Sequence, residues 1–247
     1  MARNPLHRLV GKYAMEATVT GVREVTPTMR AIRLTAEAPI EFTYSPGQHI
    51  RIQINDPLSV SGLLRPGETL RTYTIWEFDR DARELELRAH LYDGDGIGLR
   101  WAREVRAGDA VTFWWPERNF FVRDADYHLF VGEETASAAF GPMLRALDQC
   151  TPVCGVLESE TPDLDPPLPG PHRLRRVHRE GRPAASSTVL LDAVTGLDLP
   201  ADAGVAYVAG EARTCQLVRD HLVRDRGWPR TSVKVKPFWT PGKRGLH

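Results

Sequence analysis

Residues 127–136 read YHLFVGEETA. The run Tyr127–Gly132 is short and apolar and ends at a glycine, which is typical of a buried strand, and a helical stretch, Glu134–Leu147, follows it. The same succession recurs at Val205–Gly210, a strand, and Glu211–Arg226, a helix. Strands that alternate with helices predict a parallel sheet. The second half of the chain is therefore predicted to be an α/β domain, to which we also assign the strands Val153–Leu157 and Ser232–Phe238 and the helix Val189–Val194.

The segment before this α/β half has a different pattern. Its apolar residues alternate with polar ones over short runs rich in β-branched and aromatic side chains, which is typical of antiparallel strands. The predicted strands are Glu16–Glu24, Met29–Thr35, His49–Ile54, Leu70–Phe78, Leu85–Tyr92 and Ala110–Trp115. One helix, Gly98–Val105, interrupts them. Six such runs predict an antiparallel β-barrel or a β-sandwich. We place the domain boundary near Val122–Ala125, giving domains 1–123 and 124–247.

Composition and charge narrow the class of protein. The chain is 42% hydrophobic and has 32 basic and 32 acidic residues, so its formal net charge is zero. This balance argues against a nucleic-acid-binding surface, which needs concentrated positive charge. No apolar stretch approaches the length of a membrane span or a signal peptide. We therefore expect a monomeric cytoplasmic protein that holds no metal and whose cysteines Cys150, Cys154 and Cys215 are reduced.

A strand of the barrel half carries the tetrapeptide Arg71-Thr72-Tyr73-Thr74. Along a strand alternate side chains share a face, so Arg71 and Tyr73 are predicted to project together and the two threonines to project oppositely. An arginine can bind a pyrophosphate through two parallel hydrogen bonds, and a tyrosine ring offers a flat surface to an aromatic group. Taken alone, the tetrapeptide is also typical of an ordinary half-exposed strand.

A glycine-rich turn, Asp93–Trp101 (DGDGIGLRW), follows about twenty residues later and opens a helix. Glycines at a helix N-terminus leave backbone N–H groups open, and the helix dipole adds positive potential, which suits a diphosphate. A plain glycine turn is the alternative. The turn does not match the GxGxxG pattern of nucleotide-binding folds.

Two strand–glycine–helix junctions, Gly132–Ala136 and Gly210–Ala212, lie where an α/β sheet receives a nucleotide. Carboxylates in a first helical turn, such as Glu134, also favour the helix dipole without any ligand. Trp239 ends the last predicted strand, where it would cover a flavin or complete the core.

Together these motifs, in this order, resemble the siderophore-interacting protein family within the wider ferredoxin-reductase-like flavoproteins. The resemblance rests on the Arg-x-Tyr-Thr strand, the glycine turn ending in Arg-Trp-Ala, the Gly-acid-Glu-Thr-Ala and Ala-Gly-Glu junctions and the C-terminal aromatic-Trp run. It covers roughly Ala14 to Gly245. At the turn, Gly96-Ile97-Gly98-Leu99 stands where the family commonly has Gly-Pro-Ala-Ser, so backbone N–H groups would replace the serine hydroxyl as phosphate donors.

The resemblance implies an FAD-binding barrel, a nucleotide domain that takes NADPH or NADH, and transfer of electrons to a ferric siderophore, with release of Fe(II). The residues assigned to FAD are Arg71, Thr72, Tyr73, Thr74, His90, Tyr92, Gly96, Ile97, Gly98, Leu99 and Trp101. The residues assigned to the nicotinamide nucleotide are Gly132, Glu134, Thr135, Ala136, Gly210 and Glu211. The residues assigned to catalysis are Tyr73, Thr74 and Trp239.

Two alternatives stay open at this point. One keeps the flavoenzyme but changes its acceptor to a ferredoxin, a haem protein or a small organic molecule. The other is a protein that binds a siderophore or a nucleotide without turnover.

Overall fold

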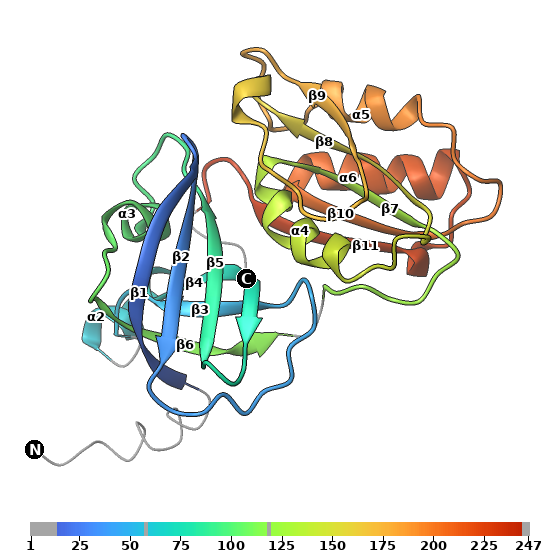
Figure 1. The fold of residues 1–247 in the computed structure, drawn as a ribbon. Coiled ribbons are helices and arrows are strands. Elements are labelled where there is room, and N and C mark those ends of the chain that lie inside the picture. Colours follow the sequence, from blue (N-terminus) through green and yellow to red (C-terminus); the bar gives the residue numbers. More distant parts are fainter. Residues whose placement is uncertain (1–13, 57–58, 118–119, 244–247) are drawn as a thin grey trace, which may run out of the picture. The chain divides into compact units, whose positions relative to one another are not determined.

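The computed structural model describes residues 14–56, 59–117 and 120–243. The chain forms two compact units. The first contains residues from 1–24 and 29–119, and the second contains residues 25–28 and 120–247. The first unit is all-β apart from short helices, and the second has helices on both faces of a parallel sheet (Figure 1).

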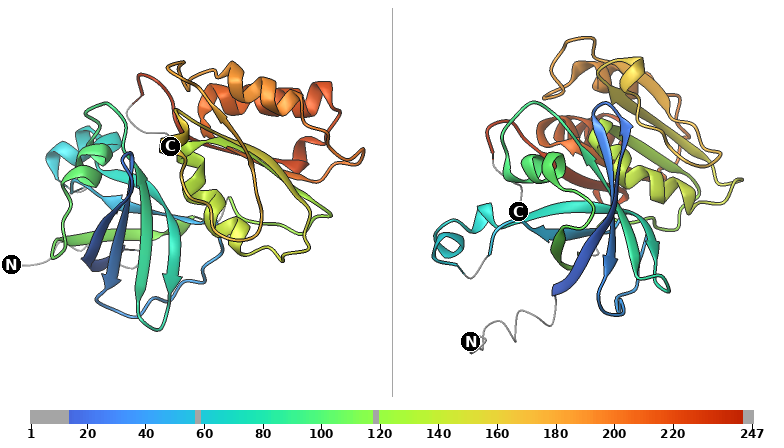
Figure 2. Two further views of the ribbon diagram at one scale, coloured as in Figure 1. Left: turned by 45° about the horizontal axis from the view of Figure 1, so that its top comes forward. Right: turned by 60° about the vertical axis from the view of Figure 1, so that its left-hand side comes forward.

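The first unit is a closed antiparallel barrel. Its strands within the described residues are β1 (Ala14–Thr26), β2 (Met29–Ala36), β3 (His49–Gln53), β4 (Leu70–Asp79), β5 (Glu84–His90) and β6 (Ala110–Glu117). They are hydrogen-bonded in the order β1-β2-β5-β4-β3-β6, and β6 pairs back with β1. The six strands predicted from alternation are confirmed, and they close into the barrel that the family resemblance implied (Figure 2).

The barrel encloses a core of branched and aromatic side chains, because every second residue of each strand points inward. Ile32, Leu34, Ile50, Ile52 and Phe113 are fully buried there. Each such side chain contributes about 1.5–3 kcal/mol relative to an exposed one.

Short helices connect the later strands of the barrel. The helix predicted at Gly98–Val105 is present as α3 (Ile97–Glu104). The sequence did not predict α2 (Val60–Leu64) or the 3-10 turn η1 (Pro66–Glu68), which precede β4.

The second unit is built on a parallel sheet. Within the described residues its strands are β7 (His128–Glu133), β8 (Val153–Ser159), β9 (Arg175–His178), β10 (Val205–Glu211) and β11 (Val233–Trp239). Their order is β11-β10-β7-β8-β9. The predicted α/β class is confirmed, and four of the strands coincide with predicted ones. The sequence did not predict β9.

Helices cover both faces of this sheet. On one face α5 (Thr188–Thr195) and α6 (Ala212–Asp220) pack against alternate residues of β7 and β10, and on the other face α4 (Ser137–Arg145) packs against the residues between them. The α4 segment begins with a 3-10 turn, η2 (Glu134–Ala136), so the helix predicted from Glu134 to Leu147 is shorter than expected.

Other helical turns complete the unit. The α6 helix continues into a π-helical turn, η4 (His221–Asp225). Two 3-10 turns, η3 (Pro162–Leu164) and η5 (Arg230–Ser232), lie in the connections that precede β9 and β11.

Three absences concern the described part of the chain. None of its helices is long and apolar enough to cross a bilayer. Its side chains form no group of three or more histidines, cysteines or acids able to hold a metal ion. All three cysteines, Cys150, Cys154 and Cys215, carry free thiols.

Candidate functional site

Arg71 and Tyr73 of β4 lie side by side against α3. They face Ile52 and Ile50 of β3 in the strand pairing, two positions apart, and so share one face of the strand. Both side chains lie over Gly98, since a Cβ atom there would come within 2.8 Å of Arg71 Cγ and 3.1 Å of Tyr73 Oη. A glycine at position 98 is therefore what allows the arginine to lie against the helix.

Tyr73 ties the strand to the helix. Its hydroxyl donates to the Gly98 carbonyl at 2.8 Å, and its ring centroid lies 5.0 Å from that of Trp101. Burial raises the pKa of Tyr73 above its usual value, so the phenol stays neutral and remains a donor. Tyr73 and Trp101 together form an aromatic surface at the start of α3.

Arg71 is held by backbone carbonyls. Its Nη1 donates to Gly67 O at 2.8 Å and to Leu70 O at 2.7 Å. Burial lowers the pKa of Arg71, but the guanidinium remains charged at neutral pH. Among the described residues its Nε and Nη2 atoms make no hydrogen bond, so they remain available as donors to an anion.

The N-terminus of α3 carries no side-chain cap. Gly96 precedes the helix, and no side chain accepts from the amides of the first turn. The first turn itself is compact, with Gly98 and Leu99 buried and Ile97 half-buried. Uncapped amides beside the Arg71 guanidinium form a positive region suited to a diphosphate.

Two arginines fix the position of α3 from outside this region. Arg103 donates to Gly94 O at 3.0 Å and to Tyr92 O at 2.5 Å, which braces the glycine turn. Arg30 of β2 donates to Ala102 O at 2.5 Å, at the C-terminal end of the helix. The cations thus satisfy carbonyls at the turn and at the helix C-terminus and leave the first-turn amides open.

The remaining predicted residues of the barrel lie around these groups. The rings of His90 and Tyr92 are stacked with centroids 6.4 Å apart, and Tyr92 is half exposed. Thr72 is exposed, whereas Thr74 is buried and pairs with His49 of β3.

In the second unit, the direction in which the chain adds strands to the sheet reverses between the neighbouring strands β7 and β10. From β7 the chain proceeds to β8 and β9 on one side, and β10 and β11 lie on the other. Parallel sheets bind ligands in the crevice outside such a point. Glu133 ends β7, Glu211 ends β10, and a register shift after Gly210 aligns Glu211 with Trp239.

Glu133 is the polar centre of this edge. It is 2% exposed. Its Oε1 accepts hydrogen bonds from Trp239 Nε1 at 2.9 Å and from the Thr135 hydroxyl, and its Oε2 accepts from Thr135 N at 2.9 Å. Burial, and then the charge of Glu134, raise the pKa of Glu133 to about 7. The carboxyl is therefore poised between its two protonation states at neutral pH.

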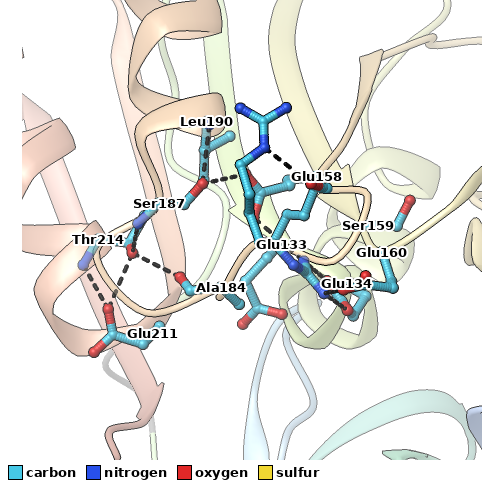
Figure 3. Close-up of polar contacts among 12 residues, drawn as sticks. Glu133, Glu134, Glu158, Ser159, Glu160, Ala184, Ser187, Leu190, Glu211 and Thr214 are labelled. Atoms are coloured by element: carbon cyan, nitrogen blue, oxygen red, sulfur yellow. Dashed lines mark hydrogen bonds and ion pairs between the residues drawn. The ribbon is translucent and has the colours of Figure 1, made fainter.

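Glu211 caps the helix that follows β10. Its carboxylate accepts from the amide of Thr214 at 2.8 Å (Figure 3). It also accepts from Arg213 N at 2.9 Å and Ser186 N at 3.1 Å. Burial acts to raise the pKa of Glu211, but these backbone donors lower it overall. The first-turn amides of α6 thus bind a carboxylate of the chain itself.

The glycines of the two junctions serve close packing. A Cβ at Gly132 would come within 2.4 Å of Ala136 Cβ and 2.5 Å of Ala209 O. Gly210 has φ 125°, and a Cβ there would come within 2.6 Å of Glu133 Oε1. Packing within the chain therefore requires glycine at both positions, whether or not a ligand binds.

A buried arginine joins the ends of three strands. Arg179, just after β9, donates from Nη1 and Nη2 to both oxygens of Glu134, at 2.6 and 2.5 Å, and also to Glu158 at 3.2 Å and Glu160 at 3.1 Å (Figure 3). Glu158 accepts a further hydrogen bond from the hydroxyl of Ser187. Of this network only Glu134 was among the predicted residues, and no local sequence signal marks the others.

Comparison with known proteins gives this geometry a family context. Residues 64–120 match the model of the siderophore-interacting FAD-binding domain, and residues 125–242 match the model of siderophore-interacting proteins. The two matches meet near the division between the barrel and the sheet unit.

Solved structures share the architecture of the whole chain. A siderophore utilization protein from T. fusca has a TM-score of 0.81 and 22% identity and covers 95% of each chain. Phthalate dioxygenase reductase has a TM-score of 0.68 and 16% identity, covering 94% of this chain and 70% of that one. At these identities the likeness shows the fold alone.

A sequence relative is longer than this chain. The mycobactin import ATP-binding/permease protein IrtA of Mycolicibacterium smegmatis is 25% identical over 233 residues, which are 92% of this chain. The chain spans 26% of the length of that relative and the same share of its counterpart in Mycolicibacterium thermoresistibile.

The barrel followed by a parallel sheet is the two-domain fold of the ferredoxin-reductase-like flavoproteins. Within that class the chain belongs to the siderophore-interacting protein family. The Arg71 donors, the open amides of α3 and the aromatic surface of Tyr73 and Trp101 fit the diphosphate and ring systems of FAD.

The structure brings the predicted residues together in two separate groups. Arg71, Tyr73, Gly98 and Trp101 meet at the start of α3. Thr135 and Trp239 meet at Glu133, a residue that was not among the predicted site residues. The assignment of individual residues to FAD or to a nicotinamide nucleotide stays a prediction.

Proposed function

We propose that the protein is a flavin reductase that takes electrons from NADH or NADPH and passes them to a ferric siderophore. The observation that carries this proposal is the conjunction of Arg71, Tyr73 and the uncapped α3 N-terminus in the FAD-binding domain of a siderophore-interacting protein. Bound FAD would supply the conversion of a two-electron hydride into single electrons, which ferric iron requires.

The barrel residues would hold this cofactor. Arg71 and the amides of Ile97 and Gly98 would bind the diphosphate, with backbone N–H groups standing in for the hydroxyl that the family's usual serine supplies. Tyr73 would orient the cofactor and, being neutral and bound to Gly98 O, would keep α3 against β4 while it does so.

The carboxyl ends of β7 and β10 would receive the nicotinamide nucleotide, because they form the switch point of the parallel sheet. The amides of Thr135, Arg213 and Thr214 already bind Glu133 or Glu211. The nucleotide would therefore be recognised by groups beside these turns.

Iron is the cargo in this proposal. Reduction of Fe(III) to Fe(II) weakens its binding by hard oxygen ligands, so reduction would release it from the siderophore. The family and the mycobactin-import relative support a siderophore as the acceptor. The chain itself need contribute no iron ligand.

An anaerobic spectral titration of the purified protein tests each step. We expect flavin absorbance in the isolated protein, bleaching on addition of NADH or NADPH, and reoxidation on addition of a ferric siderophore, with Fe(II) trapped by a colorimetric chelator. Arg71→Gln should lower FAD occupancy, whereas Arg224→Gln, which removes an exposed arginine of the sheet unit, should not.

The outcomes separate the alternatives. Absence of flavin from a folded protein would refute the proposal. Bleaching that is reversed by cytochrome or quinone but not by ferric siderophores would assign the enzyme to another acceptor. Flavin colour that neither nucleotide bleaches would exclude a nicotinamide donor.

A further inference from the structure

We propose that Glu160 selects a nicotinamide dinucleotide with a free ribose 2′-hydroxyl, NADH, against one with a 2′-phosphate, NADPH. This inference rests on the proposed function, because it concerns the electron donor of that reaction. It follows from the place of Glu160 in the sheet, from its fixed and partly exposed carboxylate, and from the hydrogen bonds already made by Arg179.

Glu160 lies at the position that reads the ribose in nucleotide-binding sheets. In such sheets the nucleotide crosses the first strand–helix turn, and an acid at the end of the neighbouring strand hydrogen-bonds to the ribose hydroxyl, whereas an arginine there accommodates a 2′-phosphate. Here β7 supplies the first turn, and β8 pairs with it in parallel and ends at Ser159. Glu160 is the next residue, at the same carboxyl edge.

The Glu160 side chain is held in one orientation but remains reachable. Its Oε1 accepts from Gly181 N at 2.6 Å, and its Oε2 accepts from Arg179 Nη2 at 3.1 Å. The backbone carbonyl of Glu160 accepts from Glu180 N at 3.0 Å. The side chain is nevertheless 35% exposed, in contrast to the fully buried Glu158. A ribose hydroxyl could donate to the exposed part of this carboxylate.

The arginine beside it has no accessible donor left for a phosphate. The Nη1 and Nη2 atoms of Arg179 carry four hydrogens, and the structure gives them four carboxylate acceptors, on Glu134, Glu158 and Glu160. The Nε atom is buried and without a partner. Arg179 therefore serves to hold three carboxylates together at this edge.

A 2′-phosphate would bring further negative charge close to the carboxylate of Glu160. Like charges in close contact disfavour binding. The competing cation is Arg182, an exposed residue whose Nε donates to Arg179 O at 3.1 Å. If Arg182 instead bound the 2′-phosphate, NADPH would be preferred. The two residues thus predict opposite specificities.

The test compares 5′-AMP with 2′,5′-ADP, which differ only in the 2′-phosphate, by isothermal titration calorimetry on the 247-residue chain with its flavin. We expect 5′-AMP to bind at least about tenfold more tightly. Glu160→Gln, which keeps the shape but removes the charge, should reduce this ratio at least about threefold. Glu180→Gln removes a neighbouring exposed carboxylate and serves as the matched control; it should leave the ratio unchanged.

Flavin bleaching with NADH and NADPH provides the second readout. Equal or tighter binding of 2′,5′-ADP by the wild type, reversed in Arg182→Gln, would overturn the inference while leaving flavin reduction intact. A ratio that Glu160→Gln does not change would overturn the role of Glu160. Failure of both dinucleotides to bleach the flavin would refute the proposed donor and this inference with it.

Discussion

Replacement of Glu133 by glutamine tests the electrostatics at the carboxyl end of β7 directly. The pKa of Glu133 is raised from 4.5 to about 7 by burial and by the neighbouring Glu134. Each pKa unit corresponds to about 1.36 kcal/mol. The native state therefore holds a proton on Glu133 that the unfolded state has already lost between these two pH values.

The sign of the pH dependence follows from this difference. The stabilisation from the protonated carboxyl is complete below pH 4.5, declines as pH rises, and is lost above pH 7. The total is on the order of 3 kcal/mol. Glu133→Gln, which cannot ionise, should not show this decline, so its stability relative to wild type should rise by about that amount over the interval.

Urea unfolding at a series of pH values from 4 to 8 measures this effect. The difference between wild type and Glu133→Gln isolates one carboxyl, because all other titrating groups are common to both proteins. Trp239 offers a second signal, since its indole donates to Glu133 and its fluorescence should change with the same midpoint. A stability difference that is constant across the whole pH range would refute this account of Glu133.

Two further predictions concern the barrel and the sheet. Gly98→Ala should weaken FAD binding by about tenfold in a fluorescence titration, because the added Cβ would displace Arg71. Gly96→Ala is the control: a Cβ there would come no nearer than 3.9 Å to any atom beyond its chain neighbours, so this variant should bind FAD normally. His128 is buried, its Nδ1 has no partner, and burial, followed by the charge of His172, lowers its pKa. Stability should therefore fall as pH drops below about 6.5, and His128→Phe should reduce that fall; an identical acid sensitivity in the two proteins would contradict this assignment.

The strands of the barrel were predictable because their sequence pattern is local, whereas their closure into a barrel was not. Each strand alternates and is bounded by turn residues, and the same alternation correctly put Arg71 and Tyr73 on one face. Strand β9 escaped prediction because its four residues, RRVH, include only one apolar side chain, Val177. It becomes a strand by pairing with β8, which no local pattern reveals.

The contacts at the carboxyl ends of the parallel strands were only partly predictable for a related reason. The junction Gly132–Ala136 was expected at the carboxyl end of a strand, and it lies at the end of β7. Arg179, however, reaches Glu134 across 45 positions of sequence, and Trp239 reaches Glu133 across 106. Contacts at such separation depend on the tertiary fold, and single-sequence periodicity does not encode them.

The anchoring of α3 has a consequence for how its leading turn can evolve. Arg30 donates a hydrogen bond to a carbonyl near the C-terminus of the helix, and Arg103, which lies in the helix, donates to two carbonyls of the glycine turn. The orientation of α3 is thus fixed by two arginines that do not contact its first-turn amides. Positions 97 and 99 of the first turn can therefore vary in side chain while the main chain presents the same amides, whereas Gly98 cannot, because a Cβ there would meet Arg71. The absence of the serine that is common in the family therefore leaves the position of the first-turn amides of α3 unchanged.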